Sequence, residues 1–118
     1  MITREQLASA RTHAADMIRR AGVPITDEEA RRIEVADFGL SRLETEGAQL
    51  LTLVQTDRLG VKAVALFPGQ TLPEHWHPPV GQDEGKEETV RVLDGEIYMY
   101  TPGDSAGAVR VPDGKEEL

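Results

Sequence analysis

The stretch of sequence from Gly69 to Gly95 decides the fold and reads GQTLPEHWHPPVGQDEGKEETVRVLDG. It holds two of the three histidines, His75 and His77, and a glutamate eleven residues later, Glu88. Side chains at positions i and i+2 of a strand point to the same face, so both imidazoles can reach one metal ion. The alternative for a bare His-x-His pair is two surface histidines that fall together by chance.

The pattern after the histidines indicates which carboxylate joins them. Glu88, Val90 and Val92 share one face of a predicted strand, whereas Glu87 lies on the other face. The face with two valines is the expected barrel interior, where a carboxylate needs a cation as its partner. We therefore expect Glu88 rather than Glu87 beside the histidines; the alternative is a solvated glutamate at the start of a strand.

Short apolar runs of strand length surround this stretch. They span residues 50–54, 61–67, 88–93 and 96–101, and residues 109–111 begin another. Asp94-Gly95 predicts a hairpin with a type I′ turn, because both central residues of that turn need positive φ. Consecutive short strands separated by Gly/Pro turns favour an antiparallel barrel or jelly roll over a parallel α/β sheet.

The first third of the chain is predicted to be helical. Thr3 and Gln6 form a capping box, after which apolar side chains recur at helical spacing. Thr26 and Glu29 form a second box, which opens a short helix over residues 27–33.

The composition excludes several classes of partner. The 118 residues carry 13 basic and 21 acidic groups, for a net charge of -8, whereas nucleic acids and anionic membrane surfaces require a basic patch. No apolar run approaches the roughly 20 residues that cross a bilayer. The chain has no cysteine, which excludes disulfides and thiolate metal sites. We expect a cytoplasmic protein without nucleic-acid or membrane partners.

The stretch quoted first resembles the first conserved motif of the cupin barrels. In this chain the pattern is Gly69, five residues, His75-Trp76-His77, ten residues, Glu88, six residues and Gly95. The run HWHPPVGQDEGKEETVRVLDGEIYMYTPG, with the preceding IEVADFGL and ALFPGQTLPEH, closely resembles the D-lyxose isomerase branch of the cupins. The resemblance covers most of the chain and implies a mainly β cupin jelly-roll barrel preceded by one or two helices. We accordingly divide the chain into a helical arm, residues 1–46, and the first part of the barrel, residues 47–118.

The resemblance also implies a metal and a reaction. In cupins the two histidines and the glutamate ligate a divalent metal, which implies His75, His77 and Glu88 here. The reaction implied is interconversion of D-lyxose and D-xylulose, and of D-mannose and D-fructose, through an enediol. Nitrogen and oxygen ligands suit Mn, Fe, Co, Ni or Zn. Binding two adjacent sugar oxygens requires two open positions, which an octahedral ion offers more readily, so Mn²⁺ is our first choice.

The loop between His77 and Glu88 is longer than is usual in cupins. By composition alone it is an acidic surface loop whose single cation is Lys86. Because Lys86 lies two residues from Glu88, its ammonium is expected to bind a sugar hydroxyl and stabilise oxyanion charge. Glu84 and Glu87 are the local candidates for a general base, and we assign catalysis to Lys86 and Glu87. The alternative is a base from sequence outside these 118 residues.

Cupins have a second motif that supplies a fourth ligand, a histidine, and no histidine follows His77 here. The predicted strands are also fewer than the eight or so of a jelly roll. We therefore expect the N-terminal portion of a longer isomerase that acts on a small sugar as a homodimer or higher homo-oligomer. The alternatives are a non-catalytic metal- or sugar-binding cupin fragment and another cupin enzyme, such as a sugar-phosphate isomerase.

The third histidine, His13, lies at the flank of the apolar helical stripe. We expect it to be structural or solvated rather than a ligand. Trp76 alternates with the two other histidines and is therefore expected to face away from the metal.

Overall fold

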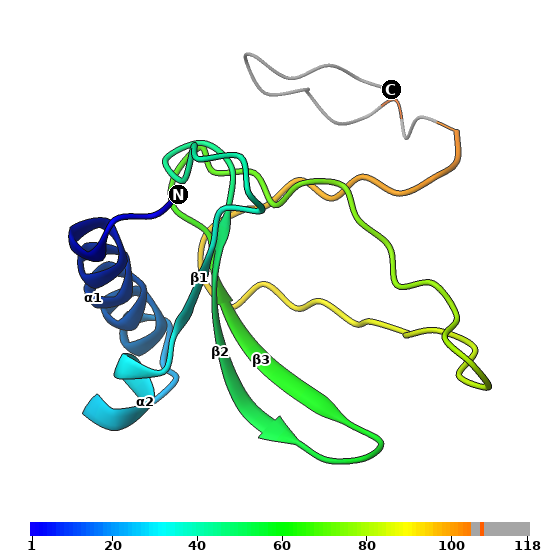
Figure 1. Cartoon of the computed structure of the whole chain (residues 1–118), viewed down its shortest axis with the longest axis horizontal. Helices are drawn as coiled ribbons and strands as arrows, with labels where there is room; N and C mark the ends of the chain where they lie inside the picture. Colours follow the sequence, from blue (N-terminus) through cyan, green and yellow to red (C-terminus); the bar gives the residue numbers. More distant parts are fainter. Residues whose placement is uncertain (105–106, 108–118) are drawn as a thin grey trace.

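The regular elements of the described residues are a three-stranded antiparallel sheet, a long helix that packs against it and a short second helix (Figure 1). The computed structural model describes residues 1–104 and 107. Its elements are α1 (Arg4–Arg20), α2 (Asp27–Arg31), β1 (Glu34–Ala36), β2 (Ala48–Gln55) and β3 (Gly60–Ala65). The strand order is β1-β2-β3, and α1 contacts all three strands. In the described part of the chain, no helix is long and apolar enough to cross a membrane.

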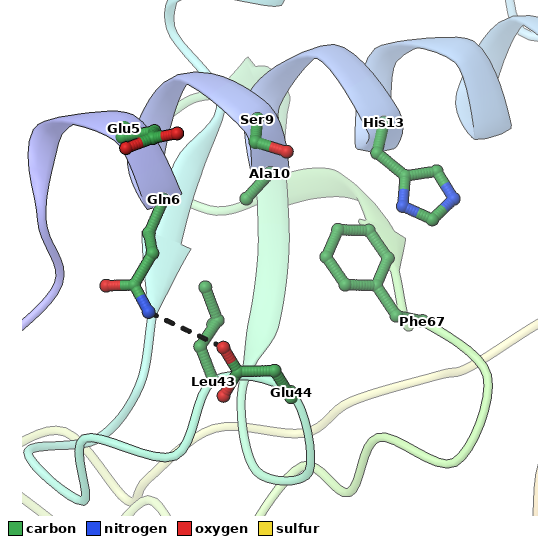
Figure 2. A pocket seen from close by; sticks show the side chains of 8 residues that line it. All are labelled: Glu5, Gln6, Ser9, Ala10, His13, Leu43, Glu44 and Phe67. Carbon is green, nitrogen blue, oxygen red and sulfur yellow. Dashed lines mark hydrogen bonds between the residues drawn. The ribbon is translucent and has the colours of Figure 1, made fainter.

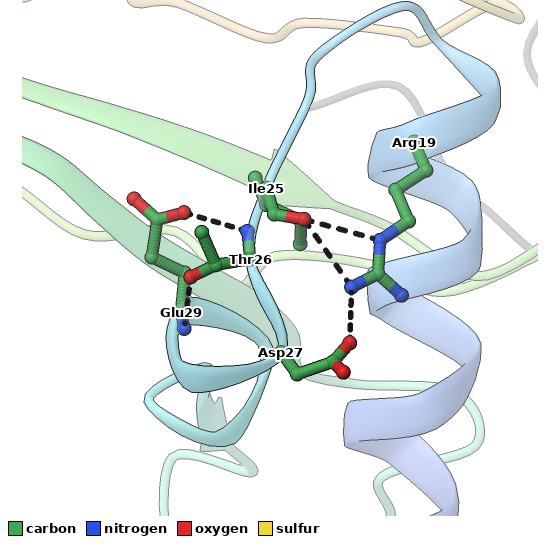
Figure 3. Close-up of polar contacts among 5 residues, drawn as sticks. All are labelled: Arg19, Ile25, Thr26, Asp27 and Glu29. Carbon is green, nitrogen blue, oxygen red and sulfur yellow. Dashed lines mark hydrogen bonds and ion pairs between the residues drawn. The ribbon is translucent and has the colours of Figure 1, made fainter.

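Both predicted capping boxes form. The Thr3 hydroxyl accepts from the Gln6 backbone N–H at 3.1 Å, and the Gln6 side chain accepts from the Thr3 N–H at 2.9 Å. Thr26 and Glu29 repeat this exchange at the start of α2, at 3.1 and 2.8 Å (Figure 3). The hydrogen bond from the Thr26 backbone lowers the pKa of the Glu29 carboxyl below its ordinary value. Both helix starts are therefore set by local sequence.

The corner between α1 and α2 is held by one arginine. The Arg19 guanidinium donates to the Ile25 carbonyl at 3.3 and 3.4 Å and to an Asp27 carboxylate oxygen at 3.0 Å (Figure 3). This places a cation at the end of α1 and an anion at the start of α2, where each suits the helix dipole.

The core lies between α1 and the sheet. Ala14, Ala15 and Ile18 of α1 share one helix face and pack with Ile33 and side chains of the sheet. The residues that the sheet contributes are Leu51 of β2 and Ala65 of β3. Small alanines let the helix approach the strands closely, so this short sheet still has one buried face.

Two of the predicted strand runs are confirmed. Residues 50–54 lie in β2 and residues 61–65 in β3, joined by a turn in which the Thr56 N–H donates to the Leu59 carbonyl at 2.8 Å. β1 was not predicted, because it is only three residues long and is defined by its pairing with β2. Since β1 lies within residues 1–46, both segments of the predicted division contribute to one sheet. α2 ends at Arg31, two residues before the end predicted for it.

The hairpin predicted over residues 88–101 is wrong. The structure assigns no strand within this range, and the two segments diverge from the bend at residues 93–95 (Figure 1). Gly95 has a φ of 81°, but Asp94 does not have positive φ, so a type I′ turn does not form. Val90 and Val92 are 56% and 44% exposed, and a two-stranded ribbon without a packed face is only marginally stable. The strand predicted at residues 109–111 lies outside the described residues, and the jelly roll stays a prediction.

A buried hydrogen-bond network ties β2 to the segment that leads to the histidines. Gln49 is 0% and Gln70 8% exposed, and the Gln49 amide donates to Gln70 Oε1 at 3.0 Å. Gln70 Oε1 also accepts from the Phe67 N–H at 3.0 Å, while its Nε2 donates to the Leu43 carbonyl at 2.6 Å. Gln70 therefore fixes the backbone five residues before His75.

Replacing Gln70 by alanine is expected to lower the free energy of unfolding by about 2–4 kcal/mol. The change leaves the Gln49 amide, the Leu43 carbonyl and the Phe67 N–H without this partner. Urea unfolding measures the effect. Gln55→Ala, at an exposed position of β2, is the control and is expected to cost less than about 0.5 kcal/mol. Equal losses in the two variants would contradict the importance of this network.

Candidate metal centre

The long loop after His77 folds back and returns the chain to that histidine. Val80 and Asp83 exchange two backbone hydrogen bonds of 3.0 Å, and Gly81 between them has a φ of 63°. The Asp83 carboxylate then accepts from the Gly85 N–H at 3.1 Å. Gly85 has a φ of 105°. Positive φ at both glycines permits the sharp turns of this loop, which projects away from α1 (Figure 1).

The structure brings the three predicted ligands together. The donor atoms of His75, His77 and Glu88 lie within 4.8 Å of one another, and His77 Nε2 is 3.3 Å from Glu88 Oε1. The imidazole rings meet edge to face, with centroids 5.4 Å apart and planes at 82°. Two ligands that bind one ion at about 2.1 Å lie roughly 3–3.5 Å apart, a spacing that His77 and Glu88 already have.

The route to this arrangement differs from the expected one. No strand is assigned to residues 75–77, so the two imidazoles converge from an irregular segment rather than from one strand face. His75 Nδ1 lies 2.9 Å from the Pro73 carbonyl, which can only accept a hydrogen bond. In the neutral imidazole this contact places the hydrogen on Nδ1 and leaves the lone pair on Nε2, the tautomer in which metal-binding histidines are usually held. Sequence reasoning missed the Pro73 carbonyl, because no local signal identifies a backbone acceptor of this kind.

Lys86 contacts the cluster formed by the donor atoms of His75, His77 and Glu88. Its Nζ lies 2.7 Å from Oε1 of Glu88, the same oxygen that faces His77. The hydrogen bond from Lys86 is the main cause that lowers the pKa of the Glu88 carboxyl below its ordinary value, and the charges of Lys86, His77 and His75 act in the same direction. Glu88 is thus a carboxylate at neutral pH, the form that ligates a metal.

Comparison with characterised proteins identifies the family. The chain is 50% identical over 109 residues to a D-lyxose ketol-isomerase from Cohnella laeviribosi, an alignment that covers 91% of this chain and 60% of the relative. It is 43% identical to a D-lyxose ketol-isomerase from Thermofilum and to a D-lyxose/D-mannose isomerase from Thermosediminibacter oceani. These two alignments cover 98% and 99% of this chain, and 66% of each relative. The chain belongs to the D-lyxose isomerase family. It spans 60% to 66% of the length of these relatives, and no protein-family model matches it.

The D-lyxose isomerase resemblance of the HWHPPVGQDEGKEETVRVLDGEIYMYTPG run is thereby confirmed. The roles of individual residues stay predictions. Glu84 and Glu87 are both exposed, and neither makes a hydrogen bond or ion pair within the described part of the chain, so the geometry does not choose between them as general base. Trp76 is 78% exposed and contributes no donor to the cluster.

A hollow lies elsewhere on this chain, beside α1. It has a volume of about 310 Å³, and Figure 2 shows it between α1, Leu43, Glu44 and Phe67. His13 stacks on Phe67 with centroids 4.3 Å apart and planes at 12°, and Gln6 donates to Glu44 at 3.4 Å. His13, which is expected to be structural or solvated, is exposed apart from this contact with Phe67. His75, His77 and Glu88 line no part of this hollow, and the side chains of His77 and Glu88 are 38% and 44% exposed to solvent.

Replacing Gly85 by alanine is expected to weaken Mn²⁺ binding by about tenfold, as loss of a supporting contact does at metal sites. A Cβ at this position would lie 2.9 Å from the His77 carbonyl oxygen, and its φ disfavours a side chain, so the loop must move away from His77. Gly81→Ala is the matched control, because Gly81 also has positive φ but open space around its Cβ position. Calorimetric titration distinguishes them; equal losses of affinity would contradict the proposed close approach.

Proposed function

We propose that this chain provides the divalent-metal centre of a sugar isomerase that interconverts D-lyxose and D-xylulose, with D-mannose and D-fructose as a second pair. The observation that carries the proposal is the convergence of the donor atoms of His75, His77 and Glu88 within 4.8 Å. Relatives 43% to 50% identical to the chain are named D-lyxose ketol-isomerase or D-lyxose/D-mannose isomerase, and these names support isomerisation of D-lyxose and of D-mannose.

The three side chains would hold the metal through two imidazole nitrogens and one carboxylate oxygen. Such a set suits Mn²⁺, Fe, Co, Ni or Zn, and we propose Mn²⁺ because an octahedral ion leaves positions open for a sugar. When bound, the metal supplies Lewis-acid polarisation of two adjacent sugar oxygens.

Lys86 and Glu87 are the proposed catalytic residues. The Lys86 ammonium is half exposed beside Glu88, where it can donate to a hydroxyl of a sugar bound at the cluster and stabilise negative charge on that oxygen. In the aldose-to-ketose direction one hydrogen leaves C2 and one arrives at C1, while the O2 hydroxyl loses its proton and O1 gains one. The Glu87 carboxylate is proposed to take the C2 proton and return it to C1.

The local charge favours an uncharged sugar. Asp83, Glu84, Glu87 and Glu88 surround Lys86 in the sequence, so a phosphate would meet four carboxylates and one ammonium. The test is to offer D-lyxose and D-lyxose 5-phosphate separately with Mn²⁺ and to measure the ketose formed. We expect D-xylulose from D-lyxose and at least about tenfold slower turnover of the phosphate; preference for the phosphate would contradict the proposal.

Cytoplasmic location and homo-oligomeric assembly also stay predictions. A chain without cysteine suits a reducing compartment but does not require one. Val54, Val61 and Val64 of the sheet are 45%, 40% and 49% exposed, which favours association. Light scattering after size-exclusion chromatography is expected to give a dimer or larger assembly, and a monomer at micromolar concentration would contradict the second prediction.

A further inference from the structure

One carboxylate oxygen of the proposed metal centre is shared between two nitrogens. Glu88 Oε1 lies 2.7 Å from Lys86 Nζ and 3.3 Å from His77 Nε2. The shorter contact is a charge-assisted hydrogen bond between two full charges. The Lys86 side chain is 55% exposed, so it can move away from Glu88 into solvent without displacing core side chains. The ammonium thus occupies the oxygen that a metal between His77 and Glu88 would use.

The ammonium and a metal ion repel each other at this position. A divalent ion bound to Glu88 Oε1 at about 2.1 Å would lie roughly 4 Å from an ammonium that kept its present contact. The repulsion between a double and a single positive charge at that separation is reduced by solvent but not abolished. Lysine has a flexible four-carbon stem, so it can relieve the repulsion by turning away.

We propose that Lys86 is the resident counter-ion of Glu88, that a divalent metal must displace its ammonium to bind, and that metal binding thereby releases Lys86 towards the sugar. The inference rests on the metal site proposed above. Metal binding then precedes substrate binding, because Lys86 becomes free to bind the sugar only when the metal has replaced its ammonium on Glu88.

The test compares the Mn²⁺ affinity of four proteins by calorimetric titration, without any substrate. Lys86→Met, which keeps the apolar stem and removes the charge, is expected to bind Mn²⁺ about 5- to 20-fold more tightly than the unmodified chain. Lys86→Arg keeps a cation and is expected to stay within about threefold. Lys62→Met removes the same charge from an exposed position of β3 and is expected to change affinity by less than about twofold.

A second measurement follows the ammonium itself. Acetylation of Lys86 by an N-hydroxysuccinimide ester, measured by mass spectrometry relative to Lys62, is expected to become about threefold faster when Mn²⁺ is added. Equal or weaker Mn²⁺ binding by Lys86→Met would overturn the inference while leaving the metal site intact. Absence of metal binding in all four proteins would overturn both the inference and the proposed function.

Discussion

Replacement of Glu88 by glutamine is expected to weaken Mn²⁺ binding by at least about 100-fold. Loss of a group that merely supports a metal ligand costs about 10- to 100-fold in affinity, and Glu88 is itself the carboxylate that the described residues contribute to the cluster. The amide keeps the size of the side chain but lacks the negative charge that attracts the ion. The amide oxygen can still accept a hydrogen bond from Lys86, but the ion pair is lost, so the ammonium beside the two imidazoles has no opposite charge on residue 88.

The matched control for this prediction is Glu87→Gln. It removes the same charge from the adjacent residue, which is exposed and lies outside the cluster. We expect its affinity for Mn²⁺ to fall by no more than about threefold, because an exposed carboxylate outside the ligand set attracts the ion only weakly. Comparable losses in the two variants would show that net acidity, rather than the geometry at Glu88, determines binding.

Replacement of Leu51 by alanine is expected to lower the free energy of unfolding by about 3 kcal/mol. Leu51 is 1% exposed and lies in the core cluster that joins α1 to the sheet. The truncated side chain leaves a cavity that Ile18 of α1 and the buried Ile33 can fill only in part, because both already pack in the same core cluster. Chemical denaturation, followed by far-UV circular dichroism, measures the change.

Leu53→Ala tests whether this effect belongs to the core rather than to the strand. Leu53 lies in β2, at the irregularity between Thr52 and Val54, and is 37% exposed. The same atoms are removed, but from a side chain that water already reaches, so a loss below about 1 kcal/mol is expected. If both leucine variants lost the same free energy, the core would not lie where the structure places it.

The parts of the fold that local sequence determines could be predicted. The helix starts were predicted because Thr3 with Gln6 and Thr26 with Glu29 carry their own hydrogen-bond partners three residues away. β2 and β3 were predicted because each is an apolar run and a short turn joins them. In both cases the residues that decide the structure lie close together in the chain.

The parts that depend on distant partners could not be predicted. β1 is a strand because Val35 pairs with Gln49, and the sequence of a three-residue strand does not indicate its distant partner. The Asp94-Gly95 signal failed for the converse reason, because its turn needs two packed strands and Val90 and Val92 remain largely exposed. The Gln49–Gln70 network was missed because two polar side chains twenty-one positions apart in the sequence form a hydrogen bond only in the folded chain.

The candidate site was predicted in its members but not in its construction. The spacing of His75, His77 and Glu88 identified residues whose donor atoms the structure brings within 4.8 Å. Residues 75–77 do not form the strand that was expected to align the two histidines. The loop that folds back between Val80 and Asp83 brings Glu88 to them instead. The direct hydrogen bond between Lys86 and Glu88 was also beyond sequence reasoning, which placed the two only near each other.

The dependence of isomerisation on bound metal tests the central claim most directly. The protein would be stripped with EDTA, dialysed, and titrated with Mn²⁺ while conversion of D-lyxose to D-xylulose is followed. We expect no conversion by the stripped protein and a rate that rises with bound Mn²⁺ to a plateau at one ion per chain. Conversion that persists without metal, or that is unchanged in the combined His75→Ala, His77→Ala and Glu88→Gln variant, would contradict the account.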